Sequence, residues 1–198
     1  MNKNTIRRAA VLLGASAVAL TAVAPANAAY FGAKVDSQTQ PSNAFQGQDC
    51  STGPGSCTRV ENDAYQYAGH ELAPKSGKIK KISLVGGVPG SFKLGLAKVN
   101  GSGDTAQVKI TRQGPTINYV GSDENALDYN VETFKVKNLK VKKGEQIAAT
   151  SDSPLSTLRC SSGGDNTLEN QPALSVGGPF STVTSTDGCW MLIGATIK

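Results

Sequence analysis

The sequence predicts an all-β protein, and three observations support this class. Short runs rich in Val, Ile, Thr and aromatic residues follow one another from residue 76 onward, separated by clusters of Gly, Pro, Asn, Asp and Ser. Several runs alternate apolar and polar residues, as a strand with one buried face does. No window of a dozen residues has the apolar spacing of a helix. About eight or nine such runs favour an antiparallel β-sandwich with jelly-roll-like connections.

The first 28 residues have the pattern of a cleaved secretory signal peptide. Basic residues open the segment, an apolar run at 9–24 follows, and the small residues Ala26, Asn27 and Ala28 form a cleavage pattern. The apolar run is rich in Ala and Gly and shorter than the roughly 20 residues that cross a bilayer. We therefore expect cleavage after Ala28, no stable membrane insertion of the mature chain, and a secreted, extracellular protein.

Cleavage would leave a mature chain with little net charge. The signal segment holds three of the 20 basic residues and no acidic one, so 17 basic and 15 acidic residues remain, a net charge of +2. Nucleic-acid-binding proteins usually carry a strongly basic face, so we predict no nucleic-acid partner. We divide the mature chain into an irregular segment at 29–64 and a β-sandwich domain at 65–198.

The four cysteines predict two disulfides, because an even number of cysteines in an exported chain is usually paired. Three pairings are possible. We favour Cys50 with Cys57, because the intervening "STGPGS" forms turns readily, and Cys160 with Cys189. A zinc site is disfavoured, because the sequence has no Cys-x-x-Cys pair and a single histidine.

One stretch predicts a local irregularity. In "VETFKVKNLKVKKGEQIAAT", residues 131–150, the apolar residues fall on even positions as far as Val136 and on odd positions from Leu139. A shift of one residue moves strand side chains to the opposite face, so we expect a bulge or corner at Asn138. Gly144 should then occupy a turn with positive φ, and a return strand should follow.

These segments carry a resemblance to a known group. The succession "SGKIKKISLVGG", "FKLGLAKV", "VETFKVKNLKVKKGEQIAAT" and "CWMLIGATIK" resembles a broad group of secreted, mostly uncharacterised actinobacterial β-sandwich proteins. In that group a Phe-containing strand runs into a segment resembling Pro-Val-Lys-x-Gly-Asp. Leu139-Lys140 stands here in place of an apolar-Pro pair, and Glu145 in place of Asp; the matching residues are Phe134, Val141, Lys142, Gly144 and Ile147. The resemblance covers about residues 76–198 and implies a fold and a compartment, with no catalytic residues to transfer.

No catalytic or metal site is predicted. A Ser-His-acid arrangement would depend on His70, and the sequence has no Gly-x-Ser-x-Gly turn to accompany it. Oxygen ligands for calcium occur in two loops but lack the spacing of a calcium loop, and such residues also dominate turns; they are Asp123, Glu124, Asp165, Asn166 and Glu169. We expect neither an enzyme nor a cofactor.

The candidate ligand-binding residues are aromatic and basic. Tyr65 and Tyr67 share one strand face if "DAYQYAG" is extended and would stack on sugar rings. Three further aromatic residues are expected in the core: Tyr119, Tyr129 and Trp190. The second group consists of Lys140, Lys142 and Lys143, which would form a basic rim.

Such a rim would contact an anionic cell-wall or extracellular glycan polymer. The alternative is that lysines only protect a sheet edge from association. We favour a non-catalytic binding module for extracellular polymer over a purely structural secreted protein, and place a hydrolase third.

The disulfides provide a first prediction. Intact mass of the exported protein should lie about 4 Da below the fully reduced value, two hydrogens per bridge. Peptide mapping should join Cys50 to Cys57 and Cys160 to Cys189. A free thiol at any of the four positions, in protein handled without reductant, would contradict the assignment.

Overall fold

The computed structural model describes residues 28–35, 56–62, 70–86, 89–121, 130–151 and 160–198, of which 160–166 and 185–190 are described by backbone alone. The predicted signal peptide lies outside these ranges except for Ala28. Cys50, Tyr65 and Tyr67 also lie outside them.

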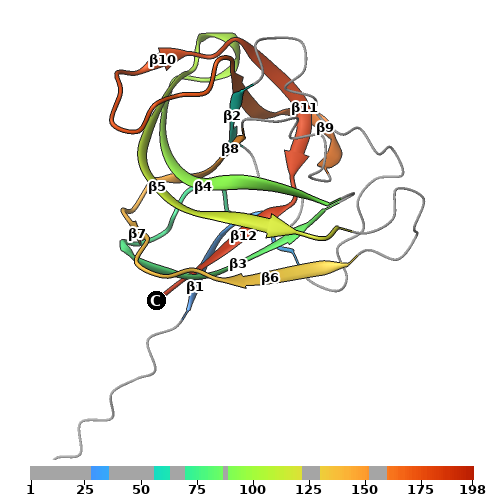
Figure 1. Ribbon diagram of the computed structural model, residues 1–198. Helices are drawn as coiled ribbons and strands as arrows, with labels where there is room; N and C mark the ends of the chain where they lie inside the picture. Colours follow the sequence, from blue (N-terminus) through green and yellow to red (C-terminus); the bar gives the residue numbers. More distant parts are fainter. Residues whose placement is uncertain (1–27, 36–55, 63–69, 87–88, 122–129, 152–159) are drawn as a thin grey trace, which may run out of the picture.

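The described chain consists of antiparallel strands and a single 3-10 turn, η3 (Gly103–Thr105) (Figure 1). The strands are β1 (Ala29–Gly32), β2 (Cys57–Glu61), β3 (Gly77–Val85), β4 (Gly90–Asn100), β5 (Gln107–Tyr119), β6 (Val131–Lys135), β7 (Lys140–Val141), β8 (Gln146–Ser151), β9 (Cys160–Asn170), β10 (Ser181–Thr182), β11 (Ser185–Met191) and β12 (Ile193–Ile197). The prediction of an antiparallel all-β class is therefore confirmed.

The strands form two sheets. The five-stranded sheet has the order β1-β12-β3-β6, and β7 also pairs with β3. The seven-stranded sheet has the order β10-β5-β4-β8-β2-β9-β11. In Figure 1 the five-stranded sheet forms the lower layer and β4 and β5 arch above it. The chain passes directly between the sheets at Leu192, where β11 ends and β12 begins.

The seven-stranded sheet curls until its two edges nearly meet. Its edge strands are β10 and β11, and only Val183 and Thr184 separate them in sequence. The Val183 amide donates a hydrogen bond to Ala106, next to β5, and the Thr184 amide donates one to Glu169 on β9. The sheet is therefore close to a barrel. The predicted jelly-roll connection is not confirmed.

The two largest apolar clusters lie on opposite faces of the seven-stranded sheet. The larger one fills the space between the two sheets and includes Leu94 and Leu96 of β4, Ile82 of β3, and Ile193 and Ala195 of β12. All six residues of β8 are buried because both of its faces are covered. The smaller cluster lies inside the curl and comprises Val60, Ala97, Ala106, Val108, Ile110, Ala148, Leu168 and Val183.

The segment at 29–64, predicted to be irregular, contributes two paired strands. β1 pairs with β12, and β2 lies between β8 and β9. All five residues of β2 are buried. Three of these five residues are polar, namely Thr58, Arg59 and Glu61, so the segment lacks the apolar run expected of a strand buried on both faces, and its composition is typical of a loop.

The predicted irregularity at Asn138 is confirmed. The Val136 amide donates to Lys80 at 2.8 Å, and the Ile79 amide donates to Leu139 at 2.9 Å, so β6 and β7 follow the same edge of β3 with a bulge between them. Asn138 has φ 63°, a conformation that Asn tolerates better than most residues. Val136 and Leu139 are both buried.

The return strand predicted after Gly144 takes a different course. β8 does not pair back on β7 but enters the seven-stranded sheet between β4 and β2. Gly144 has the expected positive φ, 81°. The turn is therefore a connection between sheets and not a hairpin.

Cys57 is buried and disulfide-bonded. Its predicted partner, Cys50, lies outside the described residues. In the β9–β11 pair, Cys189 is opposite Ser162, two residues along β9 from Cys160. Both pairings remain predictions.

Gly144 permits a test of the connection. A β-carbon at this position would meet no atom within 4 Å, so Gly144→Ala should destabilise the protein through its backbone conformation alone, by about 1 kcal/mol. Gly144→Asn should cost less, because Asn adopts positive φ more readily. Urea denaturation of the three proteins measures both differences. An Ala variant as stable as the native protein would contradict the assigned turn.

Candidate functional site: a basic cleft beside β4 and β5

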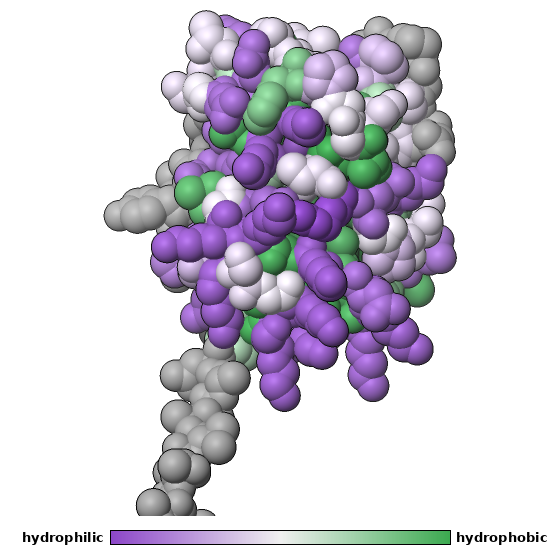
Figure 2. All heavy atoms as spheres, turned by 90° about the vertical axis from the view of Figure 1, so that its left-hand side faces the viewer, coloured by the Kyte–Doolittle hydropathy of each residue, from purple (hydrophilic) through white to green (hydrophobic). Residues whose placement is uncertain are grey.

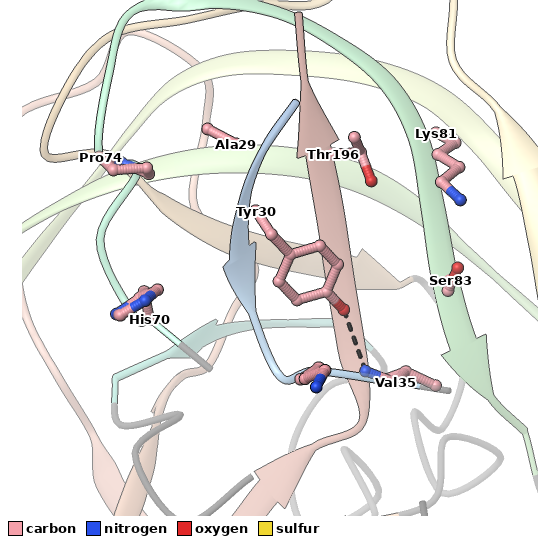
Figure 3. A pocket seen from close by; sticks show the side chains of 9 residues that line it. Ala29, Tyr30, Val35, His70, Pro74, Lys81, Ser83 and Thr196 are labelled. Atoms are coloured by element: carbon pink, nitrogen blue, oxygen red, sulfur yellow. Dashed lines mark hydrogen bonds between the residues drawn. The ribbon is translucent and has the colours of Figure 1, made fainter. Parts of the chain in front are cut away.

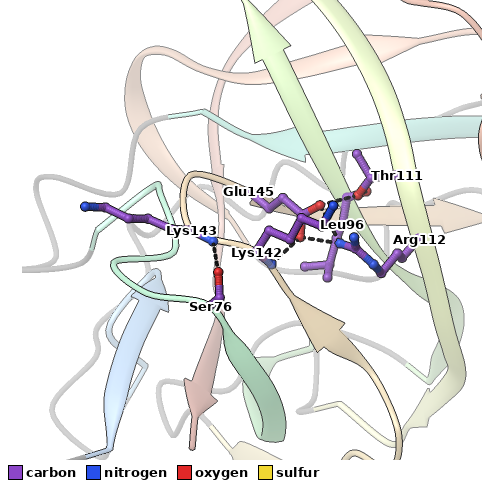
Figure 4. A network of polar contacts seen from close by, with 7 residues as sticks. All are labelled: Ser76, Leu96, Thr111, Arg112, Lys142, Lys143 and Glu145. Carbon is purple, nitrogen blue, oxygen red and sulfur yellow. Dashed lines mark hydrogen bonds and ion pairs between the residues drawn. The ribbon is translucent and has the colours of Figure 1, made fainter.

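The three lysines predicted to form a rim are all exposed, and their surroundings differ. Lys140 lies on β7, opposite Lys78 of β3. The Lys143 amide donates to the Ser76 hydroxyl at 3.0 Å, and its side chain points away from the neighbouring polar network (Figure 4). Of the three, Lys142 lines a cleft. The rim itself stays a prediction, and one of its members lines the cleft.

This cleft forms where one face of β4 and β5 extends beyond the five-stranded sheet. Leu94 and Leu96 of β4 belong to the core between the sheets, whereas Lys98, further along β4, is exposed. Lys98 is opposite Lys109 of β5. The same strand face therefore changes from apolar to basic at the point where its cover ends.

A buried carboxylate separates the cleft from the core. Glu145 is fully buried, and its two oxygens lie 2.5 and 2.6 Å from Nη1 of Arg112. The Thr111 hydroxyl and the Lys142 amide each donate to the same carboxylate at 2.7 Å (Figure 4). Three donors from β5 and the turn before β8 thus hold Glu145, and its charge is matched by Arg112.

The remaining cations of the cleft have no acidic partner. Among the described residues, Lys98, Lys109 and Lys142 make no ion pair, since the one carboxylate that lines the cleft is bound to Arg112. Phe180 also lines the cleft and is 37% exposed. The Lys109 ammonium lies 6.0 Å from the Phe180 ring centroid, at the limit of a cation–π contact.

The volume of the cleft and its lysine side chains suit an anionic ligand. The cleft has a volume of about 410 Å³ and is open to solvent, within the range of sites that accept small molecules or polymer segments. Figure 2 shows the face of the molecule that lies on the left of Figure 1, and hydrophilic side chains gather across its middle and lower parts. Lysine ammonium groups bind phosphate and carboxylate as point charges.

Exposed basic side chains outnumber exposed acidic ones among the described residues. The described surface is therefore more basic than a net charge of +2 for the whole mature chain would suggest. Three acidic side chains are buried, namely Glu61, Glu145 and Glu169, and the other described ones are Glu71, Asp104 and Glu132. Exposed lysines are more frequent and include Lys78, Lys80, Lys81, Lys98, Lys135, Lys137, Lys140, Lys142 and Lys143. The remaining acidic residues lie in parts of the sequence whose side chains are not described.

The other sequence candidates do not form a described site. Glu169 is buried and pairs with Arg59 at 2.5 Å, so it is committed to an internal ion pair. Asp123 and Glu124 lie outside the described ranges, and the side chains of Asp165 and Asn166 are not described. Within the described side chains no cluster of His, Cys, Asp and Glu has the arrangement of a metal site.

Tyr119 lies in the core, as the sequence indicated. It is 3% exposed, its ring centroid lies 6.1 Å from that of Phe92, and burial, with a smaller contribution from Glu132, raises the pKa of its phenol above the usual value. A platform for sugar stacking must be exposed, so Tyr119 is not one. Tyr129 lies outside the described ranges, and the side chain of Trp190 is not described.

Three residues of the cleft, Lys98, Lys109 and Phe180, were not predicted from the sequence. They meet only through the pairing of β4 with β5 and the approach of the segment before β10. Two register shifts interrupt the β4–β5 pair, between Lys93 and Gly95 and between Leu96 and Ala97. The juxtaposition of the two lysines therefore has no signal in the local sequence.

Comparison with known proteins assigns no relative to the chain. No protein-family profile matches it, and no curated protein or solved structure shows significant similarity. Across the described residues, no helix has the length and apolarity needed to cross a membrane.

The Glu145 network should contribute to stability. Glu145→Ala removes the acceptor for three donors and should cost about 2 kcal/mol or more, since hydrogen bonds to charged groups contribute about 1.5–3 kcal/mol each. Arg112 is 28% exposed, so water will compensate part of the loss. Glu145→Gln keeps one acceptor oxygen and should lose less. Thermal or urea unfolding that gives equal stability for the native and Ala proteins would contradict this role.

Proposed function

We propose that the protein is an exported, non-catalytic binding module that holds an anionic extracellular polymer, such as a phosphate-bearing cell-wall glycan, in the basic cleft. The observation that carries the proposal is the convergence of Lys98, Lys109 and Lys142 on one concave surface with no available carboxylate among its described residues. Export is supported by the sequence pattern of residues 1–28.

The arrangement favours a polymer over a small, tightly held anion. The lysines come from three separate segments and are partly or fully exposed, so each contributes little alone and the sum depends on several contacts. A chain with repeated charges supplies those contacts together and raises the effective concentration of each successive group. Phe180 offers an apolar surface for the uncharged parts of the repeating unit.

The fold suits this role as a rigid support. We infer that it is a β-sandwich variant in which one of the two sheets is curled into a near-barrel. Lys98 and Lys109 are on paired strands, and Lys142 is fixed by the hydrogen bond between its amide and Glu145. A site built on strands and a braced turn loses less conformational entropy on binding than one built on loops.

Two triple variants with the same charge test the proposal. The first, Lys98→Gln with Lys109→Gln and Lys142→Gln, removes the cleft lysines. The control, Lys137→Gln with Lys140→Gln and Lys143→Gln, removes three exposed lysines that do not line the cleft. Retention on immobilised inorganic polyphosphate and on isolated cell walls should fall about tenfold or more for the first variant and much less for the control.

Retention of the native protein should also decrease steeply as salt rises past about 0.15 M, where the screening length is roughly 8 Å. Equal losses in the two triple variants would show non-specific attraction and contradict a site. Binding to duplex DNA as tight as to polyphosphate at the same salt would contradict selectivity for the extracellular polymer.

A further inference from the structure

A second concave site lies on the outer face of the five-stranded sheet, away from the basic cleft. It is a groove of about 630 Å³ that is open to solvent. Its floor is Tyr30 of β1 and Thr196 of β12, and β3 contributes Lys81 and Ser83. Figure 3 shows Lys81 and Ser83 on one side of the Tyr30 ring, and His70 and Pro74 on the other.

The Tyr30 ring is held in place from below. Its hydroxyl donates a hydrogen bond to the Ala33 carbonyl and accepts one from the Val35 amide at 3.0 Å. A β-carbon built on Gly194 would overlap Cζ and the hydroxyl of Tyr30, so the ring rests directly against the glycine of β12. Glycine at this position therefore permits the ring to lie over the sheet.

The Tyr30 ring is held in a position from which it can stack on a ligand. Tyr30 is half-buried, and both hydrogen-bonding functions of its hydroxyl are used within the protein, so the ring contributes its apolar surface to the groove. Restricting the ring before a ligand arrives lowers the entropy lost on binding. The groove's volume lies within the range of about 300–1,000 Å³ that is usual for ligand sites.

Polar groups surround the ring. The Ser83 and Thr196 hydroxyls can each donate and accept hydrogen bonds, and Ser83 already contacts the Thr133 hydroxyl at 2.9 Å. Lys81 is exposed and makes no ion pair among the described residues. The described residues that line the groove include no carboxylate. A ligand with a flat apolar face, several hydroxyls and one negative charge matches these groups.

We propose that this groove binds an acidic saccharide, with the pyranose ring stacked on Tyr30 and its carboxylate beside Lys81. The site is separate from the basic cleft, and its binding does not depend on the function proposed for that cleft. It adds recognition of the sugar ring itself, whereas the cleft has been assigned mainly on the charge of its three lysines.

The N-terminus of the exported form would lie at this groove. Ala29 lines it, and the expected signal cleavage falls directly before Ala29. Cleavage there would place the new α-ammonium group at the groove wall. The protein for binding experiments should therefore be produced by export, with its native N-terminus and without an N-terminal tag.

Binding of trigalacturonate, compared with its fully methyl-esterified and hence neutral counterpart, tests the groove by calorimetry. The native protein should bind the acid at least threefold more tightly than the ester. Tyr30→Ala should weaken binding of both ligands about tenfold. Lys81→Gln should weaken binding of the acid alone, by about threefold.

Matched controls distinguish binding in this groove from binding in the cleft and from non-specific electrostatic attraction. Lys80→Gln removes the neighbouring exposed lysine on β3, which does not line the groove, and Phe180→Ala removes the exposed aromatic residue of the cleft. Neither should change trigalacturonate binding. Because Tyr30→Ala can loosen β1, Tyr30→Phe serves as a second variant that keeps the ring, and it should retain most of the binding.

The proposal is overturned if the native protein binds neither sugar, or if Lys80→Gln and Lys81→Gln have equal effects. Loss of sugar binding in Phe180→Ala with full binding in Tyr30→Ala would also overturn it, and would place the sugar in the cleft. Failure of polyphosphate retention with intact trigalacturonate binding would reject the cleft and keep the groove.

Discussion

Both faces of the seven-stranded sheet are apolar, and covering both of them determines the architecture. Ile147 and Ala149 of β8 face the core between the sheets, while Ala148 faces the cluster inside the curl. The five-stranded sheet covers the first face, and the seven-stranded sheet covers the second by curling on itself. An exposed apolar face of this size would favour association. The near-closure between β10 and β11 is therefore a consequence of burial, and it leaves the two-residue strand β10 as one of the sheet's edges.

The two proposed sites lie where this cover ends or is thin. The basic cleft begins at the point where β4 and β5 extend beyond the five-stranded sheet, and Glu145 stands at that boundary. Its carboxylate can remain buried because Arg112 and the donors around it satisfy its charge and lone pairs. The groove lies on the outer face of the five-stranded sheet, which has no further layer of described residues over Tyr30. Both proposed binding surfaces thus lie on parts of the sheet faces that the core does not use.

Local chemistry in the sequence predicted the features that depend on neighbouring residues. The change of parity around Asn138 and the glycine at 144 were both predictable, because a bulge and a positive-φ turn are encoded within a few positions. Features that depend on pairing between distant parts of the chain were not predictable from the sequence. β2 has buried polar residues in place of an apolar run, because its polar side chains find partners on distant strands, and Lys98 meets Lys109 only through an interrupted strand register. The position of the Tyr30 ring could not be predicted from the sequence, because it depends on contact with Gly194, far away in the chain.

The cleft lysines are proposed to form one site for a repeating anion. Nuclear magnetic resonance of the ¹⁵N-labelled protein, titrated with short-chain inorganic polyphosphate at physiological salt, tests this most directly because it locates the contact. We expect saturable shifts of the amide signals of Lys98, Lys109 and Lys142 and their neighbours, with little change along β9 on the far side of the sheet. Shifts scattered over all the exposed lysines, or confined to the outer face of β3 and β6, would contradict a single site in the cleft.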